Sequence, residues 1–324
     1  MASYPKPPHS VSLQERDIEF LCGLFECRVM TTEHIAVLYF ENHREATKKR
    51  LQKFKAAGLI AERPRRAFEA SALFLAPGGL AALRDHGVLS EYPSFDIPVL
   101  ERRARVSQLT IAHELEVMDV KAAFHVAASS GKAGSVVVAE FSTWPLLNEF
   151  TAFRPDGSEV LMRPDGFIRL HEKEPNDGLS EHTFFLEIDR STETLDTLTA
   201  KAACYLDYYK SGSFAERNGA RRSAFKDYPF RVLMVFKTPE RRNNMAERLL
   251  KNNPPIFTQV CLATIADATK DPFGAVWFRP MDYRDAITGT PFVAAAEQRQ
   301  RAYQRQTARD LFIERSMKKV PLLQ

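Results

Sequence analysis

Cysteine, glycine and long apolar runs are scarce in this sequence of 324 residues. Its four cysteines form no C-x-x-C pair and no zinc-knuckle spacing, which favours buried reduced thiols and a cytosolic compartment. No stretch approaches about 18 apolar residues, and the first ten residues, MASYPKPPHS, contain no apolar h-region. We therefore expect neither a membrane span nor a secretory signal. A glycine-rich phosphate loop is also missing, which leaves a ligand-sensing regulator without a supporting motif.

The bulk composition is that of an ordinary globular protein, with 44% hydrophobic and 27% charged residues. A chain of this length is long for a single hydrophobic core and sufficient for two domains, each with its own core. Its net charge of +4 is small, so an argument for nucleic-acid binding must rest on where basic residues cluster.

Helical periodicity and caps predict a winged helix-turn-helix over residues 11–90. Apolar residues recur at helical spacing after Val11, Thr31-Thr32 offers a cap for a helix at 33–40, and a third helix runs from His43 to Gly58. Apolar runs at 59–61 and 72–75 flank a basic stretch and predict a hairpin, and Pro77 opens a last small helix.

Basic side chains gather on the third helix and on the predicted hairpin tip. Cations on such a helix contact phosphates, and polar side chains lie near base edges in the major groove. The alternative is a solvated helix face, but the helix pair with a basic wing favours double-stranded DNA as partner. The candidate DNA-binding residues are Arg44, Thr47, Lys48, Lys49, Arg50, Lys53, Arg63, Arg65 and Arg66.

A second domain is expected over residues 101–290, after a linker at 87–105, with a polar tail at 291–324. The tail predicts an Arg- and Gln-rich helix at 294–319, which could contact DNA or a second subunit of a homodimer. The domain itself alternates helices and strands, which indicates an α/β fold. The predicted helices are 109–128, 192–209 and 241–250; the predicted strands are 135–141, 159–162, 166–170, 183–188, 231–236 and 257–264.

Arg-Pro-Asp-Gly occurs twice in this domain, at 154–157 and 163–166. Pro, Asp and Gly together favour a tight turn, and we interpret the first copy as a hairpin turn. The second copy places Asp165 before an apolar strand. In the later run FFLEIDR, Glu187 and Asp189 point to the same face of a buried strand. If the two strands are neighbours, Asp165, Glu187 and Asp189 form an oxygen-rich site for Mg²⁺ or Mn²⁺.

Lys201 shares an apolar helix stripe with Leu198 and Tyr205, so its ammonium needs a partner. A carboxylate site beneath it would provide one. The alternative is a lysine at the core edge that extends to solvent or pairs with Glu193 or Asp207.

Together, the winged helix, RPDG and the F-x-L-E-x-D-R run resemble the plasmid replication-relaxation proteins. That family includes mobilisation relaxases whose core is similar to restriction endonucleases of the PD-(D/E)-x-K fold. The resemblance covers about residues 12–265. It implies that Asp165 and Glu187 hold the metal, and that Glu140 and the helical pair His113-Glu114 occupy positions of auxiliary catalytic groups.

The sequence departs from that motif at one position, because Asp189 stands where the lysine of (D/E)-x-K is expected. Lys201 could supply that cation from the following helix. The eight histidines form no His-x-His pair, which excludes the relaxase mechanism that uses a histidine-held metal with a tyrosine nucleophile. Two hypotheses remain: a metal-dependent DNA-nicking enzyme of plasmid mobilisation with relaxosome partners, or a non-catalytic DNA-binding regulator of plasmid replication.

Overall fold

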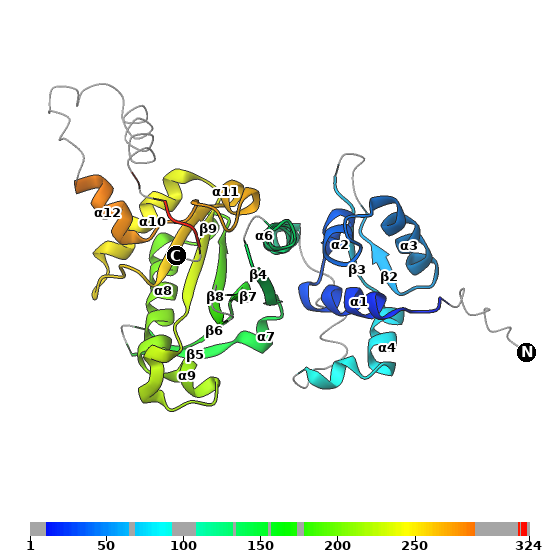
Figure 1. Ribbon diagram of the computed structural model, residues 1–324, viewed down its shortest axis with the longest axis horizontal. Coiled ribbons are helices and arrows are strands. Elements are labelled where there is room, and N and C mark those ends of the chain that lie inside the picture. Colours follow the sequence, from blue (N-terminus) through cyan, green and yellow to red (C-terminus); the bar gives the residue numbers. More distant parts are fainter. Residues whose placement is uncertain are drawn as a thin grey trace, which may run out of the picture. The chain divides into compact units, whose positions relative to one another are not determined.

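The computed structural model describes residues 11–64, 69–92, 108–131, 134–154, 157–173, 178–288, 317 and 319–322. The chain divides into two compact units (Figure 1). The first comprises Met1–Val126 with Ser142–Leu147, and the second comprises Ala127–Phe141 with Asn148–Gln324. Helices and several sheets occur along the chain, so the predicted mixed α/β class is confirmed.

The first unit contains helices arranged around a small three-stranded sheet of order β1-β3-β2, in which both pairings are antiparallel. Its elements are α1 (Glu15–Cys27), β1 (Met30–Thr31), α2 (Thr32–Tyr39), α3 (Arg44–Ala56), β2 (Ile60–Glu62), β3 (Ala72–Leu75), α4 (Pro77–Asp85), the 3₁₀ turn η1 (Val88–Glu91) and most of α6 (Gln108–Ser129).

Capping residues in the sequence explain where helices of this unit begin and end. The Thr31 hydroxyl accepts from the His34 amide and caps α2 as expected. Gly58 adopts a φ of 68° after α3, a conformation that costs glycine little. The predicted hairpin is confirmed, whereas β1 was missed because two residues carry no periodicity. Phe20, Leu24, Ile35 and Phe54 are fully buried and form the centre of this unit's core.

The second unit is built on a five-stranded sheet of order β10-β9-β8-β7-β4. Strands β8, β9 and β10 are parallel, and β7 runs antiparallel to β8. The run RVLMVF forms β9, a buried inner strand as its continuous apolar pattern predicts. The sheet strands are β4 (Val136–Ser142), β7 (Gly166–Lys173), β8 (Leu179–Asp189), β9 (Arg231–Phe236) and β10 (Val260–Thr264).

Helices α8 and α10 pack their apolar stripes on one face of this sheet (Figure 1). Phe185 of β8 lies there against Tyr205 of α8, with ring centroids 5.3 Å apart. The helices of this unit are α7 (Pro145–Asn148), which begins in the first unit, α8 (Leu195–Lys210), α9 (Ser213–Arg217), the 3₁₀ turn η2 (Arg222–Asp227), α10 (Pro239–Lys251), α11 (Ile265–Lys270) and α12 (Pro280–Thr288).

The first RPDG copy lies between two short antiparallel strands, β5 (Phe150–Phe153) and β6 (Glu159–Met162). The Gly157 amide donates to the Arg154 carbonyl at 2.8 Å, and Gly157 has a φ of 79°. The predicted hairpin turn is confirmed at these two residues. Pro155 and Asp156 lie outside the described residues, as does nearly all of the helix predicted at 294–319.

Candidate functional site

The structure brings Asp165 and Glu187 together on neighbouring strands. Gly166 of β7 pairs with Leu186 of β8, and the Asp165 amide donates to the Leu186 carbonyl at 3.0 Å. In this antiparallel register, Asp165 comes opposite Glu187 on the face covered by α8. The Asp165 Oδ2 atom accepts a hydrogen bond from the Ile188 amide at 2.8 Å, which orients this carboxylate. The condition set in the sequence analysis, that these two strands are neighbours, is met.

Glu187 is an acid buried in the sheet–helix interface, with only 4% of its surface exposed. Tyr205 of α8 donates its hydroxyl to Glu187 Oε1 at 2.6 Å. Burial and the adjacent Asp165 charge raise the pKa of Glu187 to about 7, although Lys201 and the Tyr205 hydrogen bond act in the opposite direction. Burial is thus the main reason that ionisation of Glu187 is disfavoured, and the nearby Asp165 charge adds to it.

Lys201 extends from α8 to the same site, with its Nζ atom 3.5 Å from Glu187 Oε2 and 3.0 Å from Glu193 Oε2. Burial alone would lower the pKa of Lys201, but the two glutamates outweigh it and raise the pKa above its usual range. Of the partners considered from the sequence, a site carboxylate and Glu193 are therefore present. Tyr205, one helical turn after Lys201, was not among the candidate site residues; its i, i+4 spacing from Lys201 is the signal that could have identified it.

Asp189 does not join this pair. Its carboxylate forms a two-point ion pair with Arg241 of α10, which includes a bond of 3.1 Å from Arg241 Nη2 to Asp189 Oδ1. Within the part of the chain that the structure describes, no three His, Cys, Asp or Glu side chains are grouped to hold a metal ion. The predicted set of three carboxylate ligands is thereby reduced to Asp165 and Glu187, because the Arg241 guanidinium binds the Asp189 carboxylate.

The remaining candidate catalytic residues belong to different units of the chain. Glu140 of β4 is half-buried, and its carboxylate lies 3.6 Å from Arg169 of β7. His113 belongs to α6 in the first unit, and its neighbour Glu114 forms an ion pair with Arg28 at 3.1 Å.

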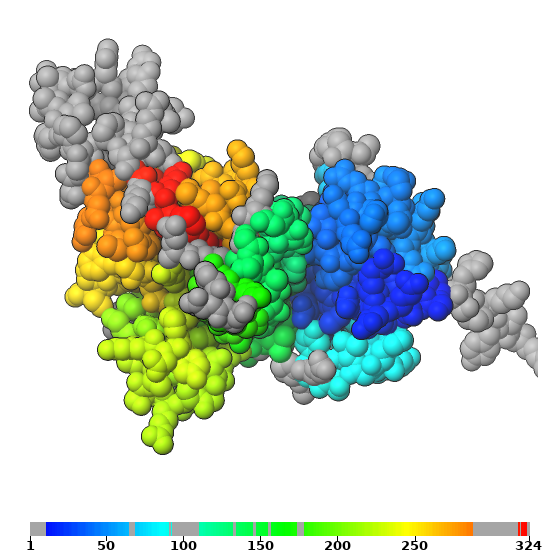
Figure 2. Space-filling model, viewed as in Figure 1, coloured from blue at the N-terminus to red at the C-terminus, as the bar shows by residue number. Residues whose placement is uncertain are grey.

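Helix α3 lies at the surface of the first unit (Figure 2). Lys48, Lys49 and Lys53, hereafter the α3 lysines, are exposed, although Lys48 contacts Glu45 at 2.8 Å. Arg44 is exposed and pairs with Glu33 at 3.2 Å. Exposed ion pairs of this kind contribute little to stability, so these cations remain accessible to phosphate groups.

Two members of the predicted DNA-binding set do not face solvent. Thr47 is fully buried and donates its hydroxyl to the His43 carbonyl at 2.9 Å. Arg50 binds the fully buried Asp17 with two nitrogens and stacks over Phe54. Since an unpaired buried carboxylate is costly, Arg50 has a structural task, and we remove both residues from the candidate interface.

The predicted wing is described only in part. The Arg63 amide donates to the Ala72 carbonyl at 2.9 Å, which extends the β2–β3 ladder by one residue. Arg65 and Arg66, predicted at the tip, lie outside the described residues.

A match to the replication-relaxation family spans residues 21–222, more than half of the chain. This protein belongs to the replication-relaxation family. The matched region contains α3, Asp165, Glu187 and Lys201, and membership indicates a role in plasmid replication or mobilisation. No curated protein and no solved structure matches the chain. Over the described ranges, no helix has the length and apolarity needed to cross a membrane.

Proposed function

We propose that this protein binds double-stranded DNA, such as a plasmid origin, and nicks it in a reaction that depends on Mg²⁺ or Mn²⁺. The observation that carries the proposal is the placement of Asp165 opposite Glu187, with the Lys201 ammonium 3.5 Å from Glu187. In this proposal the first unit is a winged helix, and the second is a restriction-endonuclease-like core.

The donor set fits a hard divalent cation. Mg²⁺ is usually held by one or two protein carboxylates together with substrate phosphates, so two carboxylates suffice. The pKa of Glu187 is raised chiefly by burial and also by the Asp165 charge, and a bound cation would offset the cost of ionising this carboxylate. When bound, the cation would supply Lewis-acid activation of the phosphodiester.

The protein side chains have separate tasks in this proposal. Asp165 and Glu187 orient the cation, and Tyr205 holds the Glu187 carboxylate in place through its 2.6 Å hydrogen bond. Lys201 replaces the lysine missing from position 189 and stabilises negative charge that develops on the phosphate. The α3 lysines hold the DNA by its backbone.

One observation favours a non-catalytic regulator instead. Asp189 stands at the strand position where the motif expects a lysine, and its carboxylate forms an ion pair with Arg241. The charge at this position is therefore neutralised within the protein. A regulator would use the first unit in the same way, and it would bind DNA without cleaving it.

A nicking assay on supercoiled plasmid distinguishes the two functions. We expect relaxation with Mg²⁺ or Mn²⁺ by the wild type, and its loss in Asp165→Asn, Glu187→Gln and Lys201→Gln. Glu159→Gln, at an exposed position of β6, is the matched control and should retain activity. Mn²⁺ binding measured by calorimetry should weaken in the Asp165 and Glu187 variants.

The assay should use plasmids that carry the cognate origin. Absence of metal-dependent cleavage on such plasmids, with DNA binding intact, would establish the regulator and refute the enzyme. Cleavage that persists in both Asp165→Asn and Glu187→Gln would show that the reaction takes place at another site.

A further inference from the structure

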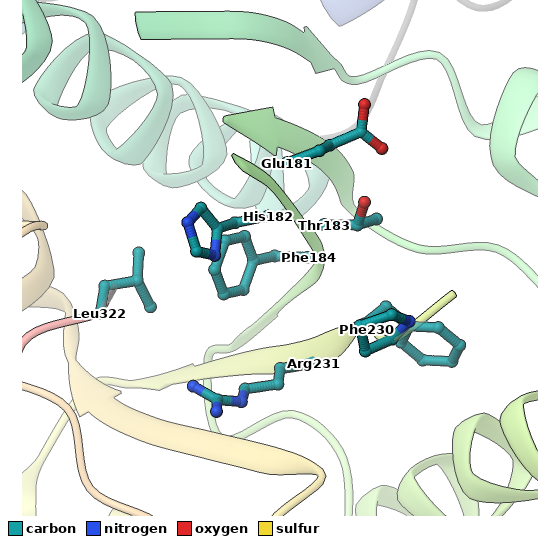
Figure 3. Close-up of a pocket in the computed structure, with 8 residues that line it drawn as sticks. Glu181, His182, Thr183, Phe184, Phe230, Arg231 and Leu322 are labelled. Atoms are coloured by element: carbon teal, nitrogen blue, oxygen red, sulfur yellow. The ribbon is translucent and has the colours of Figure 1, made fainter. Parts of the chain in front are cut away.

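Strands β8 and β9 end at the same edge of the sheet, beside the proposed nicking centre. In this parallel ladder Phe184 pairs with Arg231 at one end, and Asp189 pairs with Phe236 at the other. Figure 3 shows the first of these ends, where Phe184 and Arg231 line a cavity of about 170 Å³. At the opposite end β8 leads into α8 and β9 leads into α10, so the starts of both helices follow the Asp189 end of the ladder.

Arg241 lies in the first turn of α10 and extends to the end of β8. Its amide donates to the Thr238 hydroxyl at 3.3 Å, which fixes the backbone from which this arginine extends. The guanidinium donates to both oxygens of the Asp189 carboxylate, and its Nη2 atom also donates to the backbone carbonyl of Glu193. One side chain therefore holds both ends of residues 190–193, the β8–α8 loop, an arrangement hereafter called the Arg241 clamp.

The β8–α8 loop contains a turn that needs such support. Ser191 has a φ of 65°, in the left-handed region that residues other than glycine rarely adopt. Its amide donates to Asp189 Oδ1 at 3.0 Å, so the carboxylate that binds Arg241 also orients this turn. Thr194 then caps α8, because its hydroxyl accepts from a backbone amide of the first turn at 3.1 Å. The path from β8 to α8 is thus fixed at both ends.

The same loop determines where the Lys201 ammonium lies. The Glu193 carboxylate is 3.0 Å from Lys201 Nζ, whereas the Glu187 carboxylate is 3.5 Å from it. The nearer acid attracts the ammonium more strongly, since Coulomb energy increases as distance falls. A lysine side chain is a flexible four-carbon stem and does not keep one position by itself. Glu193 therefore anchors Lys201 beside Glu187, and the Arg241 clamp anchors Glu193.

We propose that Arg241 is a positioning residue of the nicking centre. Its clamp fixes the β8–α8 loop, and the loop holds the Lys201 ammonium beside Glu187. The proposed function, on which this inference rests, gives Lys201 the task of stabilising negative charge on the phosphate. Asp189 stands where the motif expects a lysine, and through Arg241 it helps to place the lysine that substitutes for it. Arg241 itself lies beyond residue 222, where the family match ends.

A zero-length crosslink tests the clamp without metal or DNA. A carbodiimide joins a lysine amine to a carboxylate in direct contact as an amide, with loss of water, and mass spectrometry locates the bond. We expect a Lys201–Glu193 crosslink in the wild type and a several-fold lower yield in Arg241→Met. Arg248→Met is the matched control, because Arg248 also reaches from α10 to an acid of α8, Asp196, but in an exposed pair. Its yield should equal that of the wild type.

The double variant Asp189→Asn with Arg241→Met separates positioning from stability. It leaves no unpaired buried carboxylate, so the second unit should regain its stability in urea. The Glu193 carbonyl still lacks its donor, so the crosslink yield should stay low. Recovery of the yield together with stability would overturn the proposal, as would an unchanged yield in Arg241→Met. The double variant also keeps the test decisive if Arg241→Met does not fold.

The nicking assay supplies a kinetic measurement of the same effect. In the double variant kcat should fall about tenfold or more, because a small displacement of a catalytic group is costly, while KM for supercoiled DNA stays the same. An unchanged kcat would refute the positioning role of Arg241 and leave the enzyme standing. A wild type that does not nick would refute the enzyme, and the crosslink would then still show whether the clamp places Lys201.

Discussion

Replacing Glu187 by Gln should make this protein less sensitive to rising pH. The pKa of Glu187 is raised from 4.5 to about 7 in the folded protein, chiefly because burial removes water from the carboxylate. One pKa unit corresponds to about 1.4 kcal/mol, so ionised Glu187 costs the fold about 3 kcal/mol once both states are deprotonated. Glutamine removes this cost and still offers an oxygen to the Tyr205 hydroxyl.

The sign follows from proton linkage. Below pH 4.5 the acid is protonated in the folded and unfolded chains, so its burial carries no ionisation cost. As pH rises through 7, the unfolded chain has already lost the proton, and the folded chain must lose it at a cost. The raised pKa of Lys201 has the opposite meaning, because it stabilises the fold, but it does so evenly throughout this pH range. The slope of the difference between Glu187→Gln and the wild type therefore comes from Glu187, because other contributions, such as the lowered pKa of His125, are common to both proteins.

Urea unfolding between pH 5 and pH 8 measures the effect. The protein has two tryptophans, so a Trp144→Phe background leaves Trp277 as the fluorescent reporter of the second unit. The stability of Glu187→Gln relative to the wild type should increase by about 2–3 kcal/mol over this range. Glu159→Gln is the exposed control, for which the difference should stay flat. An equally flat difference for Glu187→Gln would refute the reasoning.

Three further predictions concern ion pairs and the α3 surface. Arg50→Met leaves the buried Asp17 carboxylate without its guanidinium and should cost about 3 kcal/mol in urea unfolding, whereas Arg50→Lys should recover part of this loss. Arg241→Met should destabilise the second unit by a similar amount through Asp189, and additional Asp189→Asn should restore stability; no restoration would argue against this pair. Changing the α3 lysines to Gln should weaken DNA binding and reduce its logarithmic salt dependence by about 0.9 for each phosphate that is no longer neutralised. The control, Gln at the exposed Lys226, Lys251 and Lys270 of the second unit, changes net charge equally and should bind DNA normally; an equal decrease in both triple variants would exclude α3 as the DNA-binding surface.

Local chemistry in the sequence was sufficient for most elements of the fold. Thr31 caps α2 because a hydroxyl satisfies a free helix amide, and RVLMVF forms a buried strand because both of its faces are apolar. The carboxylates could be predicted in part for the same reason: alternation along β8 places Glu187 and Asp189 on one face. Short elements such as β1 and α7 were beyond this reasoning, since a few residues carry no periodicity.

Tertiary structure decided which charged side chain meets which. In the sequence Arg50 resembles the α3 lysines, yet it forms an ion pair with Asp17, thirty-three residues earlier. Asp189 appears equivalent to Glu187, yet Arg241, fifty-two residues later, neutralises it. A buried charge requires a partner, and packing of distant elements determines which partner is within reach. The sequence alone therefore determined the strands and turns that carry the acids, whereas only the packed fold showed that Asp189 pairs with Arg241 and not with Asp165 and Glu187.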